Sequence, residues 1–267
     1  MLRENEVPKA ERTEGQTRGL LAGTDQEVPR LCEEASLHEQ EDEIAGMGAQ
    51  AQEPPNLPDY YGTVAQDVID CCGSAGGRIW ADLGSGAGGL GLALLEEVLD
   101  GTMVLIDPNA EALCRALNDA RRRGVASRAV AVVGSAESIS MPDESVDVVV
   151  SRGSFYFWKD RAQGLREVWR ILRPGGRAMI GGGLGSTYPQ WARQEFIRRR
   201  RESVTAKGPE AAREFAEARS PETFRRLAVE AGLSSFEIIG EGGLGADDPN
   251  TGIGIWLRFT KEAENGR

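Results

Sequence analysis

The chain has 267 residues, a length that favours one large domain with appendages over two full domains. Its 31 basic and 42 acidic residues leave a formal charge of −11, which makes the chain a poor candidate for wrapping a nucleic acid. No apolar run has the length of a signal peptide core or a membrane span, and the cysteines at 32, 71, 72 and 114 have no metal-ligand spacing. We therefore expect a cytoplasmic protein that binds no metal, no membrane and no nucleic acid.

Residues 1–56 predict an acidic, disordered N-terminal extension. The segment carries a net charge of −8, contains no aromatic residue and ends in Glu53-Pro54-Pro55-Asn56. It has too little apolar surface to offset the entropy lost on ordering. His38, the one histidine of the chain, lies in this segment, so we expect the folded domain to lack the most common catalytic base.

Short apolar runs alternate with amphipathic stretches from residue 57 onward. The predicted helices cover residues 60–72, 90–99, 110–123 and 161–172. The predicted strands cover residues 78–83, 102–106, 129–133, 146–150 and 178–182. Strands that alternate with helices at this spacing predict a parallel sheet with helices on both faces.

The last third departs from this alternation. Helices are predicted over 188–207, 209–219 and 221–231, the last begun by Ser220-Pro221-Glu222. Strands 234–240 and 252–260 are joined by a loop too short for a helical crossover, so we expect an antiparallel pair. The predicted fold class is α/β, a doubly wound, seven-stranded, mostly parallel Rossmann-like sheet with an antiparallel last strand. Its domain would span 57–261 with a helical insertion at about 186–219, and 262–267 would form a tail.

A glycine-rich segment is the strongest functional signal. Asp82-Leu83-Gly84-Ser85-Gly86-Ala87-Gly88-Gly89 follows a predicted strand and opens a predicted helix. Glycines let the backbone turn sharply and approach a ligand, and the helix N-terminus adds N–H groups and partial positive charge. Gly84, Gly86 and Gly89 also satisfy the dinucleotide pattern G-x-G-x-x-G, so this loop alone does not decide between cofactors.

An acidic residue follows the second predicted strand. Asp107 ends the apolar run Met103-Val104-Leu105-Ile106 and precedes Pro108. A carboxylate at this position can accept both hydroxyls of a ribose in dinucleotide and adenosyl cofactors alike. The alternative is that Asp107 caps the following helix.

Three segments together resemble one enzyme family. They are the glycine loop with Asp82 two residues before its first glycine, the run Gly134-Ser135-Ala136-Glu137 followed by Met141–Asp147, and 167–176, which ends in Pro174-Gly175-Gly176. From about Tyr60 to Phe259 the chain resembles class I S-adenosylmethionine-dependent methyltransferases. The similar group is that of the ubiquinone/menaquinone C-methyltransferases, methyltransferase type 11.

The resemblance implies S-adenosyl-L-methionine as cofactor and assigns a set of residues to it. They are Asp82, Gly84, Gly86, Gly88, Asp107, Pro108, Ser135, Ala136, Glu137, Ser151 and Arg152. In the family, the glycines lie under the methionine part, the acid before them lies near its amino group, and the acid after the second strand holds the ribose. The next proline flanks the adenine, the 135–137 stretch borders the adenine edge, and the end of the fourth strand faces the methionine. Ser135 stands where the family often has an acid or Asn.

Aromatic residues flank the expected cofactor site. Residues 151–158 leave the fourth strand at the sheet edge where such folds bind ligands, and relatives use the helix before the first strand as a lid. The candidate acceptor residues are Tyr60, Tyr61, Ser154, Phe155, Tyr156 and Trp158. The alternative is that these rings form core beneath a lid.

The function that these patterns favour is methyl transfer to a small-molecule acceptor. A thiol, an activated carbon or a soft centre suits a folded domain that has no histidine. No catalytic residue is assigned. The alternatives are a catalytically silent binder of the same cofactor and an NAD-dependent oxidoreductase, which the Pro174-Gly175-Gly176 segment and the antiparallel end disfavour. A nucleic-acid enzyme is disfavoured because 151–154 lacks the Asn/Asp-Pro-Pro-aromatic motif of amino-methylating enzymes.

Two further features each allow a structural and a functional interpretation. Cys72 shares an apolar helix face with Val64 and Val68, which favours packing over binding of a soft metalloid by Cys71-Cys72. The run Arg198-Arg199-Arg200-Arg201 spreads around a helix, which favours a solvated face over selection of an anionic acceptor.

Overall fold

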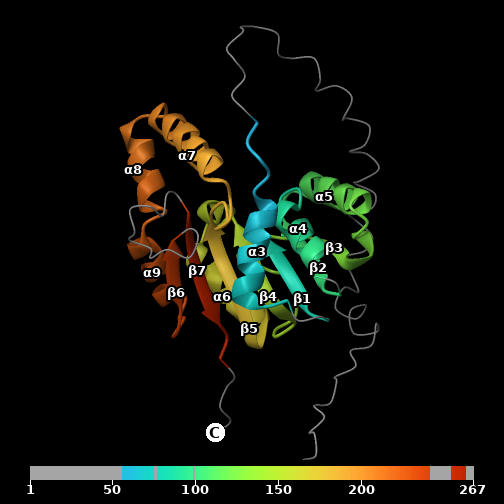
Figure 1. Ribbon diagram of the computed structural model, residues 1–267. Coiled ribbons are helices and arrows are strands. Elements are labelled where there is room, and N and C mark those ends of the chain that lie inside the picture. Colours follow the sequence, from blue (N-terminus) through green and yellow to red (C-terminus); the bar gives the residue numbers. More distant parts are fainter. Residues whose placement is uncertain (1–55, 75–76, 99, 241–253, 263–267) are drawn as a thin grey trace, which may run out of the picture.

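A seven-stranded sheet forms the centre of the protein in a computed structural model, which describes residues 56–74, 77–98, 100–240 and 254–262 (Figure 1). The strand order is β3-β2-β1-β4-β5-β7-β6. The strands are β1 (Ile79–Leu83), β2 (Thr102–Asp107), β3 (Ala129–Val133), β4 (Val146–Arg152), β5 (Leu172–Gly182), β6 (Glu237–Gly240) and β7 (Ile255–Thr260). The first five strands pair in parallel, while β7 lies antiparallel between β5 and β6. The predicted fold class is confirmed.

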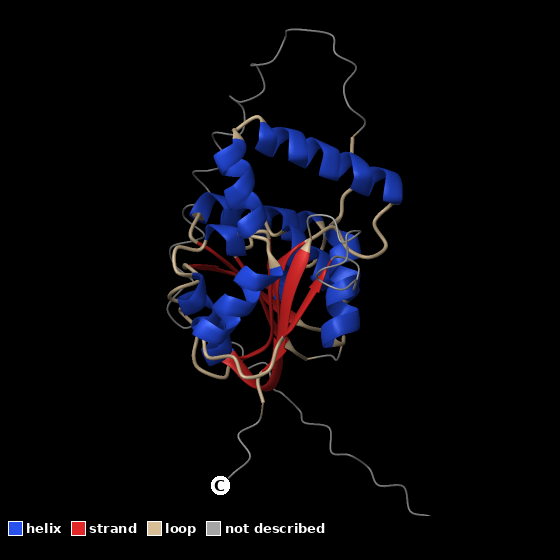
Figure 2. Cartoon of the chain, turned by 90° about the vertical axis from the view of Figure 1, so that its left-hand side faces the viewer, coloured by secondary structure: helices blue, strands red, loops and turns tan. Residues whose placement is uncertain are grey.

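Helices cover both faces of this sheet (Figure 2). They are α3 (Tyr61–Cys72), α4 (Gly89–Glu97), α5 (Ala110–Arg122), α6 (Arg161–Ile171), α7 (Gln190–Thr205), α8 (Pro209–Glu217) and α9 (Pro221–Glu230), with the short 3-10 helices η2 (Ala126–Arg128) and η3 (Phe155–Phe157). Ser220 caps α9, as predicted, by accepting a hydrogen bond from the Thr223 N–H. None of the described helices is both long and apolar enough to cross a membrane.

Alternation along the strands divides the core into two layers. All five residues of β1 are buried, but Ala81 and Leu83 enter one hydrophobic cluster while Trp80 enters the other. In β2, Val104 and Met103 are divided between the clusters in the same way. Successive strand side chains point to opposite faces, so a strand that is apolar throughout needs helices on both sides. This burial fixes the central strands and, with them, the loops at their carboxyl ends.

Helices α7 and α8 lie at the end of the sheet, beyond β5 (Figures 1 and 2). Tyr188 and Ala192 form a small cluster with Leu184, and Leu57, Tyr60 and Phe196 pack against it. The cluster joins the helical insertion to the segment before α3. The insertion therefore stands over the same sheet edge as the glycine loop.

Candidate functional site

The glycine loop follows β1 and leads directly into α4. Gly84, Gly86 and Gly88 have φ angles of 72°, 54° and 81°. A Cβ at Gly84 would lie 2.2 Å from the Ser154 side chain, so no larger residue fits there. A Cβ at Gly86 would meet nothing within 4 Å, so this glycine is needed for its backbone conformation, and the space beside its Cα is open.

Asp107 connects the end of β2 to this loop. Its carboxylate accepts hydrogen bonds from the N–H groups of Gly86 and Asn109, both at 2.8 Å. The cap of α5 is instead Asn109, whose side chain accepts from the Ala112 N–H. The helix-cap interpretation of Asp107 is therefore wrong, and the carboxylate is held at the sheet edge beside the glycine loop.

Asp82 lies beneath the loop and is 2% exposed. Its carboxylate accepts a hydrogen bond of 2.9 Å from the Gly91 N–H inside α4. Burial raises the pKa of Asp82 to about 7, and nearby Asp107 adds to the rise. The carboxyl group thus supports the loop and changes charge near neutral pH.

The segment after β3 lies beside Asp107. The Gly134 N–H donates to the Asp107 carbonyl at 3.1 Å, and Ala136 is buried. The Glu137 carboxylate accepts from the N–H groups of Lys159, at 2.6 Å, and Asp160. Glu137 thus fixes the start of α6, a role that the sequence interpretation missed. Pro108 is exposed, and Ser135 forms an isolated bridge with Ser138.

Two serines connect the end of β4 to the end of β1. The buried Ser151 hydroxyl lies 2.7 Å from the Ser154 hydroxyl, which donates to the Leu83 carbonyl at 2.8 Å. Arg152 Nε donates to the Gly183 carbonyl after β5, and its guanidinium lies 3.9 Å from the centre of the Tyr60 ring. The carboxyl ends of β1, β4 and β5 therefore form one continuous surface.

Tyr60 and Tyr61 pack together at the start of α3, with ring centres 4.7 Å apart. The Tyr61 ring covers the beginning of α4, because a Cβ at Gly89 would lie 2.3 Å from it. Burial raises the pKa of Tyr61 to about 12, with Tyr60 contributing. One tyrosine lies on the glycine loop and the other faces Arg152, so both predicted residues lie at the sheet edge.

The aromatic segment after β4 is divided between core and cavity. Phe155 is fully buried and Trp158 is 9% exposed, and the Phe155 ring lies 5.0 Å from that of Phe224 in α9. Phe155 and Trp158 belong to the hydrophobic core, which corrects the prediction that both line the acceptor pocket. Phe157 is exposed. Tyr156 lines two cavities beneath the helical insertion, and Phe157 lines the larger of them.

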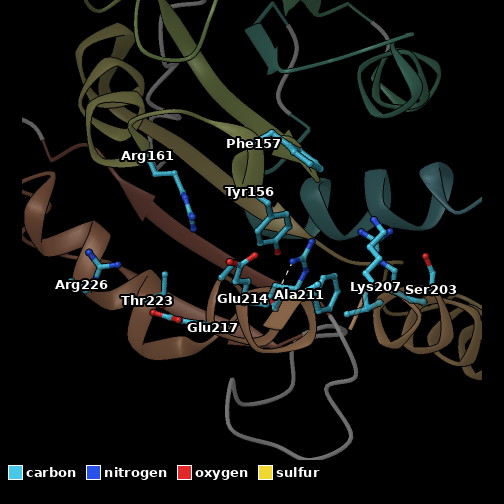
Figure 3. Close-up of a pocket in the computed structure, with 15 residues that line it drawn as sticks. Tyr156, Phe157, Arg161, Ser203, Lys207, Ala211, Glu214, Glu217, Thr223 and Arg226 are labelled. Carbon is cyan, nitrogen blue, oxygen red and sulfur yellow. Dashed lines mark hydrogen bonds between the residues drawn. The ribbon is translucent and has the colours of Figure 1, made fainter. Parts of the chain in front are cut away.

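Two cavities meet at Tyr156 beneath the helical insertion. The smaller has a volume of about 310 Å³ and is lined by Tyr60, Arg152, Gly153, Tyr156, Gly182, Gly183, Leu184, Phe196, Arg200 and Arg219. We call it the arginine cavity. The larger has a volume of about 710 Å³, shares Tyr156, Arg200 and Arg219 with it, and lies between η3 and helices α7 and α8 (Figure 3).

The four consecutive arginines of α7 have different surroundings. Arg198 forms ion pairs with Glu195 and Glu202, and Arg199 pairs with Glu195. Arg200 lines both cavities, and Arg201 is exposed. Arg198, Arg200 and Arg201 are exposed, as the solvated-face interpretation predicts, but Arg200 also forms part of the wall of both cavities. The sequence interpretation also missed Arg219, for which a position just before the Ser220 cap was the one available signal.

Cys72 is fully buried with Val64 and Val68, which confirms its packing role. Cys71 is half-buried at the end of α3, and its carbonyl accepts a hydrogen bond from Arg177. Arg177 starts the region of β5 that pairs with β7 and ends at Gly182. The cysteine pair therefore lies at the opposite end of β5 from the arginine cavity.

Comparison with known proteins supports one family. A family described as a methyltransferase domain matches residues 81–180. An uncharacterized methyltransferase of Mycobacterium tuberculosis is 36% identical over 133 residues, which are 50% of this chain and 48% of that protein. A ubiquinone/menaquinone biosynthesis C-methyltransferase of Vibrio parahaemolyticus is 33% identical over 114 residues, 42% of this chain and 44% of that protein. The chain spans about half the length, or less, of these curated relatives.

Solved structures agree over a longer region. A structure from Methanococcus maripaludis, provisionally named an S-adenosyl-L-methionine-dependent methyltransferase, is 30% identical with a TM-score of 0.62, covering 78% of this chain and 88% of that one. An Aquifex aeolicus SAM-dependent methyltransferase, 17% identical with a TM-score of 0.51 over 75% of this chain and 90% of that one, shares the fold. The glycine loop, the carboxylate that holds it and this similarity agree: the chain belongs to the S-adenosylmethionine-dependent methyltransferase family.

Proposed function

We propose that the protein transfers a methyl group from S-adenosylmethionine to a small-molecule acceptor. The observation that carries this proposal is the hydrogen bond between the Gly86 N–H and the Asp107 carboxylate. It holds a ribose-binding type of acid against a glycine loop that opens toward the carboxyl edge of the sheet. Family membership supports the choice of cofactor.

The residues of the loop fit this cofactor on grounds of their own. The Ser85 hydroxyl is buried and has no hydrogen-bond partner among the described residues, which leaves it available to a ligand. Each carboxylate oxygen of Asp107 accepts one hydrogen bond from a backbone N–H. A carboxylate oxygen can accept more than one, so both oxygens can also accept a hydrogen bond from a ligand. We assign Asp107 to the ribose hydroxyls, Asp82 to the region of the amino group, and Ser85 to the carboxylate of the methionine part.

When bound, the cofactor supplies a methyl group on a sulfonium that already leaves readily. The acceptor nucleophile forms the new bond to the methyl carbon, the carbon–sulfur bond breaks, and the sulfur keeps its electron pair. The protein then has to align the acceptor and exclude water. Tyr61 on the start of α4, and Tyr60 packed against Arg152, are placed to cover this edge of the sheet.

Proton removal limits which acceptors are suitable. The one histidine, His38, lies outside the described residues, and burial raises the pKa of Tyr156 to about 12, which makes it a poor base at neutral pH. We therefore propose an acceptor whose nucleophile is a thiolate, an activated carbon or a soft centre, with its proton lost to solvent before or after transfer.

Calorimetry separates this function from its alternatives. We expect the full chain to bind S-adenosylhomocysteine and S-adenosylmethionine but not NAD. Gly86→Arg, which fills the open face of the loop, should lower cofactor affinity at least about 100-fold, while the exposed Arg201→Gln should leave it unchanged. Tight binding of NAD alone would refute the proposal, and binding without turnover of any acceptor would favour a silent binder.

A further inference from the structure

The arginine cavity is lined by three guanidinium groups and no acidic residue. Arg152 reaches it from β4, Arg200 from α7, and Arg219 from the segment between α8 and α9. Among the described residues, none of these three side chains forms an ion pair. Unpaired cations in a concave site raise the local positive potential and attract an anion. This concentration of positive charge occurs in a chain whose net charge is −11.

A buried polar atom marks the middle of this region. The Tyr156 hydroxyl is buried and has no hydrogen-bond partner in the part of the chain that the structure describes. Figure 3 shows the Tyr156 ring extending from η3 toward α8, and the Arg219 guanidinium lies 3.7 Å from the ring centre. A buried hydroxyl without a partner costs free energy, so a ligand that accepts its hydrogen bond would remove that cost.

The positive charges around Tyr156 also favour a bound anion. Burial raises its pKa to about 12, while Arg219, Arg152, Arg161 and Arg200 all act to lower it. Burial also lowers the pKa of Arg219, with Arg200 and Arg161 adding to the effect. An anion placed among these groups would relieve the repulsion between like charges and replace their lost hydration.

The remaining walls of the cavity are apolar. Tyr60, Leu184 and Phe196 line it together with the glycines that follow β4 and β5. A volume of about 310 Å³ is suited to a small organic molecule. Gly153 lines the cavity, and the next residue, Ser154, donates a hydrogen bond to the Leu83 carbonyl directly before the glycine loop, so a short segment connects the two.

We propose that the arginine cavity binds the oxyanion, a carboxylate or a phosphate, of a small and largely apolar methyl acceptor. This proposal rests on the proposed function, and it names the substrate class. Arg200 and Arg219 bind the oxyanion, the Tyr156 hydroxyl donates to it, and Tyr60 and Phe196 contact the apolar body. Planar guanidinium groups suit either oxyanion because they donate two parallel hydrogen bonds.

Calorimetry on the full chain saturated with S-adenosylhomocysteine tests the proposal with benzoate, phenyl phosphate and benzamide as probes. Benzoate and benzamide have nearly the same size and differ in charge. We expect benzoate, phenyl phosphate or both to bind at least about tenfold more tightly than benzamide. The two anions show which oxyanion is preferred. Equal affinities for all three, or no anion binding up to about 10 mM, would overturn the proposal.

Matched variants locate the site. Arg200→Gln and Arg219→Gln should each lower anion affinity about tenfold, whereas Arg201→Gln should not, because Arg201 lines neither cavity; none should change the affinity for S-adenosylhomocysteine. An equal loss in Arg201→Gln would show a general effect of net charge and refute the site. Tyr156→Phe should also weaken anion binding while raising the Tm of the ligand-free protein, which a purely structural role of the hydroxyl would not produce.

Failure of the proposed function has a different signature. If S-adenosylhomocysteine does not bind, the methyltransferase proposal fails, and the three probes are then titrated into the cofactor-free protein. The cavity lining contains no residue of the glycine loop, so anion binding is still expected there. If the cofactor binds and only neutral acceptors are methylated, the present inference is wrong and the proposed function stands.

Discussion

Asp82 shows how one buried side chain can support the fold and still titrate near neutral pH. Its carboxyl group is buried beneath the glycine loop, and burial raises its pKa to about 7. The folded state therefore holds this proton more tightly than the unfolded state does. The resulting contribution to stability is fully present below about pH 4 and is lost as the pH rises toward 7.

Asp82→Asn tests this linkage. The amide keeps an oxygen that accepts from the Gly91 N–H but never ionises. Relative to the wild type, we expect the variant to gain on the order of 2–4 kcal/mol of stability between about pH 5 and pH 8, with weaker cofactor binding at pH 8. Urea unfolding at several pH values measures the first effect and calorimetry the second. Parallel stability curves for the two proteins would contradict the pKa assignment.

Cys71 is a second titrating group, far from the cofactor site. A hydrogen bond from Cys72 lowers the pKa of the Cys71 thiol to about 6 against the effect of burial, and Arg258 and Arg177 lower it further. We expect alkylation of Cys71 by iodoacetamide, followed by peptide mass spectrometry, to rise through about pH 6 and to level off by about pH 8. Arg258→Gln should move the midpoint upward. A rate that keeps rising past about pH 9 would show an ordinary thiol.

At the scale of elements, the central strands could be predicted because each is apolar and bounded by turn residues. The start of β5 could not be predicted from the sequence. It begins at Leu172 and not at Ala178, because Leu172 pairs with Val146 across a register shift before the regular ladder starts. Pro174-Gly175-Gly176 within it looks like a turn in the sequence, since proline and glycine are rare inside strands.

The candidate site also contains residues that could be predicted from the sequence and residues that could not. The glycine loop and Asp107 are apparent from the sequence because each directly follows a predicted strand. Arg200 and Arg219 are not, because they are 19 positions apart with helix α8 between them, and only the folded insertion brings both to Tyr156. Four consecutive arginines on a helix point in different directions, and the sequence does not say which one lines a cavity.

Helix α9 provides an element-scale test. Phe224 is fully buried against Phe155, while Val229 on the same helix is 63% exposed. Phe224→Ala should lower the free energy of unfolding by about 3–5 kcal/mol through loss of packing, and Val229→Ala should change it by less than about 0.5 kcal/mol. Chemical unfolding followed by fluorescence measures both values. Similar losses in the two variants would show that α9 is not anchored through Phe224.

At the scale of the whole molecule, most of the net acidic charge belongs to a part of the sequence outside the described residues. Residues 1–56 carry −8 of the formal charge of −11, and 1–55 lie outside the described residues. The charge that an entering molecule meets at the arginine cavity is instead positive. The pI of about 4.8 therefore gives no guide to the acceptor.

A truncation starting at Asn56 should bind S-adenosylhomocysteine as tightly as the full chain. The groups assigned to the cofactor begin at Asp82, and the covering tyrosines at 60 and 61 are retained. Calorimetry on the two proteins measures the difference. A loss of affinity beyond about tenfold would show that the N-terminal segment takes part in binding.

The residues that line the arginine cavity come from several segments of the chain, and this bears on how acceptor specificity could be altered. The loops after β1 and β2 hold the proposed cofactor residues, whereas Phe196, Arg200 and Arg219 come from the segment between β5 and α9. Under the two proposals, the insertion contributes to acceptor choice without contributing to the glycine loop or Asp107, although Tyr60, Arg152 and Tyr156 also line the cavity. If both proposals hold, exchanging the stretch 186–219 for another helical pair would change the acceptor while leaving the methyl donor the same, so directed evolution of acceptor choice would start in this stretch.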